Sequence, residues 1–70
     1  MTIRLKTIED VNNFVNICSK CDHDVYAIQD ELKINAKSIL GIYSLNLLKE
    51  FEVATSIDNF YKNIERWKCW

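Results

Sequence analysis

The chain has 70 residues, almost half of them apolar, and its nine basic and ten acidic side chains leave a formal net charge of −1. This length allows one small domain that buries about 60% of its unfolded surface, which argues against a deep active-site cleft. The balanced charge provides no basic stripe for nucleic acid, and no apolar run is long enough for membrane insertion. We therefore expect a single domain over residues 1–70.

The first part of the chain predicts a strand followed by an amphipathic helix. Apolar and polar residues alternate over Thr2–Lys6, the pattern of a half-buried strand. Thr7 can cap a helix, with Glu9 and Asp10 at its positive end. Behind this cap, apolar side chains recur at helical spacing: Val11, Phe14, Val15 and Cys18. The helix is expected to bury this stripe and to end near residues 20–22.

A β-hairpin is expected next, with a two-residue turn at Gln29-Asp30. In this register four apolar side chains face the core: Val25, Ala27, Leu32 and Ile34. His23 also points toward the core in this arrangement. Tyr26 and Ile28 lie on the opposite face of the sheet, where they could support a homodimer.

The stretch Ile34–Leu45 changes its period at Ser38. Before Ser38 the residues alternate as in a strand, and after it they show helical spacing. Ser38 therefore stands at the N-cap of a short helix, where its hydroxyl can accept from the backbone N–H of residue 40 or 41. Seven apolar residues follow, too many for one buried face: Ile39, Leu40, Ile42, Tyr43, Leu45, Leu47 and Leu48. We expect some of them to form an exposed patch that binds a partner.

Two further elements complete the predicted order. Residues 50–54 alternate as a fourth strand, and Ser56 can cap a last helix with Asp58 at its positive end. The expected buried stripe of this helix is Ile57, Phe60, Tyr61, Ile64 and Trp67. The order β-α-β-β-α-β-α predicts an α+β protein in which two or three helices cover one face of an antiparallel sheet.

The stretch around Ser38 contains a short motif, Lys37-Ser38-Ile39 followed by Gly41 and Ser44-Leu45. The stretch that contains them resembles the segment around the regulatory serine of HPr, the histidine-containing phosphocarrier of the bacterial sugar phosphotransferase system, and the element order agrees over the whole chain. The resemblance implies the HPr-like open-faced β-sandwich, with a four-stranded antiparallel sheet in the order 1-4-2-3.

The resemblance also implies a regulatory site on the short helix. In the family an ATP-dependent kinase phosphorylates the serine that matches Ser38, and the apolar residues behind it dock on partner proteins. Here those positions hold Ile39, Leu40 and Tyr43, and we expect Lys37 to add a charged contact. The expected partners are proteins, among them phosphotransferase-system or HPr-kinase-like proteins.

The place of the family's phosphocarrier histidine reads Lys6-Thr7-Ile8-Glu9-Asp10 in this chain. It holds no histidine, arginine or proline, and its two carboxylates would repel a phosphoryl group at the helix N-terminus. The single histidine, His23, comes after the first helix and does not match that role. We therefore expect a regulatory, protein-binding member of the family that is not an enzyme and uses no metal or cofactor.

The cysteines leave a second interpretation open, a metal- or redox-responsive module built on Cys18 and Cys21. A redox pair is favoured at the start of a helix, where the dipole lowers the thiol pKa, whereas this pair closes one. A zinc site would have to recruit Cys69 from the far end of the chain. Zinc content and thiol titration test this interpretation. Three cysteines without a visible secretory leader also predict a reducing, cytoplasmic location.

A third interpretation is a purely structural or oligomerising domain that uses the outer face of the sheet. Concentration-dependent mass in solution tests it.

Overall fold

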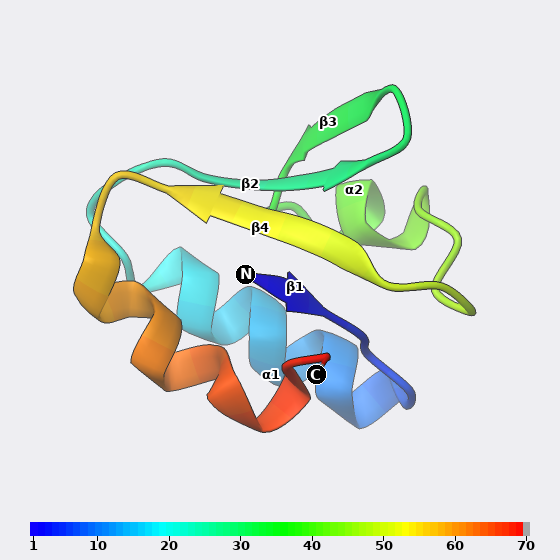
Figure 1. The fold of residues 1–70 in the computed structure, drawn as a ribbon, viewed down its shortest axis with the longest axis horizontal. Coiled ribbons are helices and arrows are strands. Elements are labelled where there is room, and N and C mark those ends of the chain that lie inside the picture. Colours follow the sequence, from blue (N-terminus) through cyan, green and yellow to red (C-terminus); the bar gives the residue numbers. More distant parts are fainter. Residues whose placement is uncertain (70) are drawn as a thin grey trace.

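The computed structural model describes residues 1–69, so Trp70 lies outside the described part. Its elements are β1 (Thr2–Ile3), α1 (Ile8–Ser19), β2 (Val25–Gln29), β3 (Leu32–Asn35), α2 (Ile39–Tyr43), β4 (Phe51–Thr55) and the 3₁₀-helix η1 (Asp58–Trp67). The strands form one antiparallel sheet in the order β1-β4-β2-β3. Helices pack on one face of this sheet and leave the other open (Figure 1). The predicted α+β class and the predicted strand order are confirmed.

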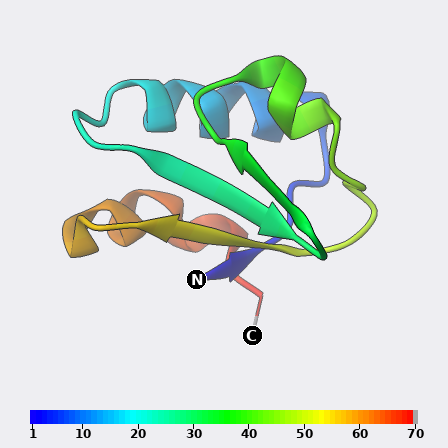
Figure 2. The same ribbon diagram turned by 90° about the horizontal axis from the view of Figure 1, so that it is seen from above.

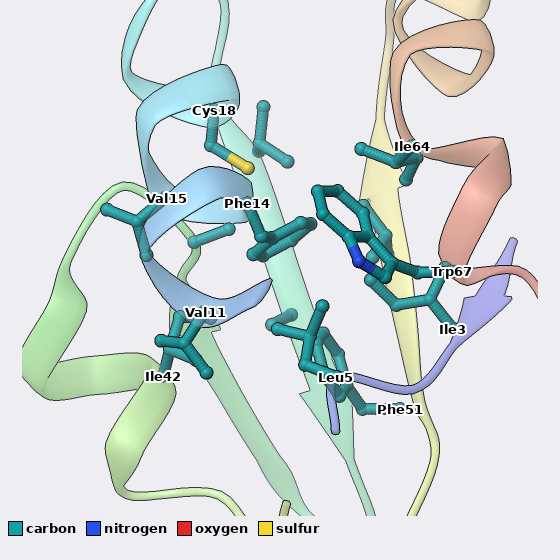
Figure 3. Close-up of a cluster of buried hydrophobic side chains, with 14 of the residues drawn as sticks. Ile3, Leu5, Val11, Phe14, Val15, Cys18, Ile42, Phe51, Ile64 and Trp67 are labelled. Carbon is teal, nitrogen blue, oxygen red and sulfur yellow. The ribbon is translucent and has the colours of Figure 1, made fainter. Parts of the chain in front are cut away.

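The core lies between the sheet and the helices. The predicted apolar stripe of α1 is buried along its whole length: Val11, Phe14, Val15 and Cys18. The Phe14 ring meets Phe51 of β4 and Trp67 of η1 edge-on, with ring centres 5.8 and 6.0 Å away (Figure 3). Edge-to-face aromatic pairs stabilise a fold beyond the burial of their apolar surface. These three rings therefore help to hold α1 and η1 against the sheet.

Helix α2 packs beside the N-terminal half of α1 (Figure 2). Its fully buried Ile42 lies close to Val11 of α1 (Figure 3). The start of α1 is capped as predicted, because Thr7 Oγ1 accepts from the Asp10 N–H at 3.0 Å. Helix α1 ends at Ser19, one residue before the expected region.

The first strand is shorter than predicted, covering Thr2–Ile3 in place of Thr2–Lys6. Beyond it the Arg4 N–H donates to the Trp67 carbonyl at 3.0 Å, and Ile3 pairs with Lys68 in an isolated antiparallel bridge. The C-terminal end of the described chain therefore lies along the free edge of β1. Alternation alone could not reveal this contact between the two ends of the chain.

The hairpin turn is displaced by one residue from the predicted Gln29-Asp30, because Gln29 pairs with Leu32 and the turn consists of Asp30 and Glu31. Asp30 has a φ of 53°, a left-handed conformation that aspartate tolerates better than most residues. The displaced register places Ala27 opposite Ile34, whereas the predicted turn would place it opposite Leu32. Since a strand alternates with period two, the predicted faces survive although the predicted pairs do not.

Two side chains that were expected in the core are exposed. His23 lies in the connection between α1 and β2, before the strand begins. Leu32 is 49% exposed, because β3 is an edge strand of the sheet and Leu32 is its first residue, next to the turn. The prediction extended the alternation of β2 to His23, but the strand begins only at Val25.

The last helix differs from the prediction in type and in its cap. It is a 3₁₀-helix whose N-cap position is Ile57, with no side-chain hydrogen bond, so the predicted Ser56 cap is wrong. The Tyr61 hydroxyl instead accepts from the Thr55 N–H at 3.2 Å and ties the start of η1 to the end of β4. Three residues of the predicted stripe are buried and two are half-buried: Phe60, Ile64 and Trp67, then Ile57 and Tyr61.

Candidate functional site on helix α2

Ser38 caps helix α2, as predicted. Its Oγ accepts from the Gly41 N–H at 3.1 Å, and its carbonyl accepts from the Ile42 N–H at 3.0 Å. Gly41 permits this close approach, because a Cβ there would lie 3.3 Å from the Cβ of Ser38. The hydroxyl therefore has a fixed position at the start of the helix, and Ser38 is an exposed residue.

The segment before Ser38 is held by Asn35 and Ala36. The Asn35 side-chain oxygen accepts from the Lys37 N–H at 2.9 Å, and its carbonyl accepts from the Ser38 N–H at 3.0 Å. Ala36 is fully buried, and its N–H donates to the Val25 carbonyl at 2.9 Å. Ser38 is thus positioned both by the sheet before it and by the helix after it.

Lys37 makes a contact that its position beside Ser38 did not predict. Its ammonium group donates to the carbonyl of Cys21 at 2.7 Å, just beyond the C-terminal end of α1. A cation is favourable there, because the last carbonyls of a helix carry the negative end of its dipole. Lys37 therefore stabilises the end of α1, and its role beside Ser38 stays a prediction.

The apolar residues of α2 divide between the core and the surface. Ile42 is fully buried, whereas Leu40 is 81% exposed. We call the exposed set the α2 patch: Ile39, Leu40 and Tyr43, which are 41%, 81% and 45% exposed. Leu45 is also buried and Leu47 half-buried. Such a patch on an ordered helix is the feature that protein partners recognise.

Two more large apolar side chains are exposed, one in the loop after α2 and one at the start of α1. Leu48 is 80% exposed in that loop, and Ile8 is 71% exposed as the first residue of α1. Ile8 was not among the residues predicted from the sequence to bind a partner. An isoleucine at the first helical position, ahead of the buried stripe, is the signal that could have indicated it.

The loop after α2 is fixed by Gln29, which was predicted to lie in a turn. Gln29 is 8% exposed, and its side-chain amide donates to the carbonyls of Asn46 at 2.8 Å and Glu50 at 3.2 Å. Its oxygen accepts from the Asn46 N–H at 2.8 Å. One glutamine therefore satisfies three backbone groups of the loop that carries Leu48.

The N-terminus of α1, where the resemblance would place a phosphocarrier histidine, holds Thr7 as the cap and two carboxylates in the first turn. Partial burial would raise the pKa of Asp10, but hydrogen bonds from the Trp67 indole, the Lys6 N–H and Thr7 outweigh it and lower the pKa. Asp10 is therefore ionised at neutral pH. Negative charge already occupies the positive end of this helix.

Cys18 lies in the core, as the apolar stripe of α1 predicted. Cys18 is fully buried, and burial with a further contribution from Cys21 raises the pKa of its thiol to about 12, against the opposing effect of Lys37. Cys21 and Cys69 are half-buried free thiols. Within residues 1–69, no three histidine, cysteine or acidic side chains are grouped so that they could hold a metal ion.

We expect iodoacetamide at pH 8 to alkylate Cys21 in the folded protein at least 100-fold faster than Cys18. With a pKa of about 12, Cys18 has about one thiolate in 10,000 molecules at this pH, and burial also blocks access. Timed quenching and peptide mass mapping give the two rates, and alkylation in urea should make them equal. Equal rates in the folded protein would contradict the burial of Cys18.

Comparison with family models gave no match, and neither did comparison with curated proteins. Two solved structures are similar. The crystal structure of HPr-C-His from Thermoanaerobacter tengcongensis superposes with a TM-score of 0.73 at 28% identity, over 93% of this chain and 81% of that chain. This chain is an HPr-like protein. The second structure is the Bacillus subtilis catabolite repression protein Crh, with a TM-score of 0.64 at 25% identity over 94% of this chain and 77% of that one.

The comparison confirms the predicted family resemblance and the HPr-like fold. It supports a phosphocarrier-related or regulatory class for this HPr-like protein. The Crh structure is described as an intertwined dimer formed by a swapped domain. No helix within residues 1–69 has the length and apolar character needed to cross a bilayer.

Proposed function

We propose that this HPr-like protein is a non-catalytic regulatory module that binds a protein partner through the α2 patch and is phosphorylated at Ser38. The observation that carries the proposal is the exposure of the α2 patch beside a serine hydroxyl held at the helix N-terminus. Ile42 of this helix and Leu45 of the following loop already belong to the core. The residues of the α2 patch are therefore free to meet a partner.

A phosphate on Ser38 would lie next to the first backbone N–H groups of α2. The Gly41 N–H already donates to the serine oxygen, so it has the right position to donate to a phosphate oxygen. The added charge of nearly −2 would stand beside an apolar surface, which changes what kind of partner can bind there. The partner would be a phosphotransferase-system or HPr-kinase-like protein in the cytoplasm.

Phosphoryl relay is not part of the proposal. Thr7 occupies the cap of α1, and ionised Asp10 with Glu9 would repel a phosphoryl group at that helix end. His23 is exposed in the loop between α1 and β2, beyond the C-terminal end of α1. The function therefore rests on binding and regulation, not on transfer.

Incubation with an HPr kinase and ATP is expected to add one phosphate, measured as intact mass. Ser38→Ala should abolish the addition, because it removes the hydroxyl held at the start of α2. Ser44→Ala is the matched control on the same helix, since the Ser44 hydroxyl donates to the Gly41 carbonyl. We expect that variant to be phosphorylated normally.

A parallel incubation with the first enzyme of the phosphotransferase system and phosphoenolpyruvate should add nothing. Phosphate from that enzyme would contradict the proposal and make His23 the acceptor to test. If the kinase added no phosphate, phosphorylation of Ser38 would no longer be part of the proposal, and the α2 patch would remain as the proposed binding surface.

A homodimer through the open face of the sheet is a separate proposal. Tyr26 and Ile28 are half-buried there, and the Lys33 ammonium lies 4.3 Å from the centre of the Tyr26 ring. The protein's own side chains thus cover part of this face. Mass in solution as a function of concentration tests the proposal.

A further inference from the structure

The sheet has two edges, and only one of them is covered. The edge at β1 meets the end of the described chain, because Ile3 bridges to Lys68 and the Thr2 carbonyl accepts from the Cys69 N–H at 2.9 Å. The edge at β3 pairs with β2 on its inner side, and within residues 1–69 no other strand pairs with its outer side. Figure 1 shows the strands in this order, with β3 at one end of the sheet. A free edge of this kind can accept another strand.

The backbone of β3 presents hydrogen-bonding groups on that outer side. In an antiparallel pair, alternate residues exchange hydrogen bonds with the partner strand, and the residues between them face away. The Ala36 N–H donates to the Val25 carbonyl at 2.9 Å, so Ile34 and Leu32 share this inward orientation. The N–H and the carbonyl of Lys33 therefore point away from β2, where an added strand would meet them.

The side chains at this edge place an apolar residue between two opposite charges. Leu32 is 49% exposed, and the flanking Glu31 and Lys33 are exposed as well. The Lys33 ammonium lies 4.3 Å from the centre of the Tyr26 ring, which orients it on the open face of the sheet. The segment Glu31-Leu32-Lys33 is therefore complementary to a second copy of itself that runs in the opposite direction.

We propose that two copies of this protein associate by pairing their β3 edges antiparallel, which joins the two sheets into one. A residue with outward backbone groups has to stand opposite Lys33. If that residue is Lys33 of the second copy, the charges repel, and if it is Asn35, its carbonyl already accepts from the Ser38 N–H at 3.0 Å. If it is Glu31, unlike charges meet twice by symmetry, and Leu32 contacts Leu32 at the two-fold axis.

The charges at this edge select one register. A lysine on an edge strand usually opposes pairing with a second copy, but here Glu31 stands two residues away and provides the opposite charge. Because β3 has four residues, the contact is smaller than a standard interface, and the association is weak and reversible. The edge shares no residue with the α2 patch, so the inference does not depend on the role of Ser38.

A concentration series from about 0.05 to 2 mM at constant ionic strength, followed by two-dimensional ¹H–¹⁵N NMR and translational diffusion, tests the proposal. We expect saturable shifts that gather on the amides of residues 31–35, slower diffusion at high concentration, and a Kd on the order of 1 mM. Glu31→Lys and Lys33→Glu each place like charges opposite one another, and each should weaken the association at least about tenfold. Lys62→Glu makes the same charge change on η1, away from the edge, and should associate normally.

A mixture of the two edge variants tests the register. Each lysine of Glu31→Lys then faces a glutamate of Lys33→Glu, so adding the unlabelled second variant to the labelled first should restore the shifts of residues 31–35. If Lys33 faced Lys33 across the axis, Glu31→Lys alone would associate as the native protein does, which would overturn this register.

Ile28→Thr distinguishes the edge from the open face, because it changes that face and leaves both edge charges in place. Association that is lost in Ile28→Thr but survives both edge variants would overturn the proposal and place the interface on the open face. Spectra that do not change with concentration, equal weakening by Lys62→Glu, or a mixture that fails to associate would overturn it as well.

Discussion

Phe14→Ala is expected to cost about 3–5 kcal/mol of the free energy of unfolding, the usual range for removing a buried aromatic ring. A domain of 70 residues has roughly 4–10 kcal/mol in total, so this one change would leave the protein at the edge of unfolding at 25 °C. Phe14 has no exposed surface and contacts both Phe51 and Trp67 (Figure 3). Its loss therefore opens a cavity where α1, η1 and the sheet meet.

Urea unfolding followed by far-UV circular dichroism measures this effect. Leu40→Ala is the matched control, because the side chain is apolar but 81% exposed, and it should change stability by no more than about 0.5 kcal/mol. Phe14→Leu keeps part of the volume and should fall between the two. If Phe14→Ala cost no more than Leu40→Ala, the described core would be wrong.

The parts of the fold that were predicted correctly depend on short-range signals. The stripe from Val11 to Cys18 repeats with the period of a helix, and Thr7 and Ser38 each cap a helix by accepting from an N–H three residues later. These features need no knowledge of the rest of the chain. The strand order came from the family resemblance, since the element order fits more than one sheet.

Several errors concern contacts that the local pattern does not indicate. Beyond β1 the chain pairs with the C-terminal end of the described chain, and at the start of η1 the Tyr61 hydroxyl takes the Thr55 N–H while Ser56 makes no cap. The displaced turn at Asp30-Glu31 is a local error of one residue. Leu32 alternates as a core residue, yet its edge position leaves it exposed. The alternation of apolar residues within one strand does not indicate which edge of the sheet the helices leave exposed.

The candidate site was predictable only in outline. The excess of apolar residues after Ser38 indicated that some had to be exposed, and the structure identifies which ones. The contact of Lys37 with the end of α1 joins residues far apart in the sequence. The same is true of Gln29, whose polarity suggested a turn although it belongs to the buried face of β2.

Gln29→Leu is accordingly expected to destabilise the protein by about 2–4 kcal/mol, although it replaces a polar side chain by an apolar one of similar size. The change leaves the Asn46 N–H and the carbonyls of Asn46 and Glu50 without their partner, and unpaired groups at a partly buried site each cost roughly 1–3 kcal/mol before water compensates some of them. Urea unfolding measures the loss.

Hydrogen exchange then locates it. In Gln29→Leu the amide of residue 46 should exchange at least tenfold faster, because the loop that carries Leu48 loses its attachment to β2. Asn46→Ala is the matched control, since all three Gln29 bonds reach backbone atoms and survive the change; only the 3.1 Å bond from the Leu48 N–H to the Asn46 side chain is lost. That variant should lose less than about 1 kcal/mol and keep the amide of residue 46 protected. If both variants raised the exchange rate of the residue 46 amide equally, the Asn46 side chain, and not the buried glutamine, would hold the loop in place.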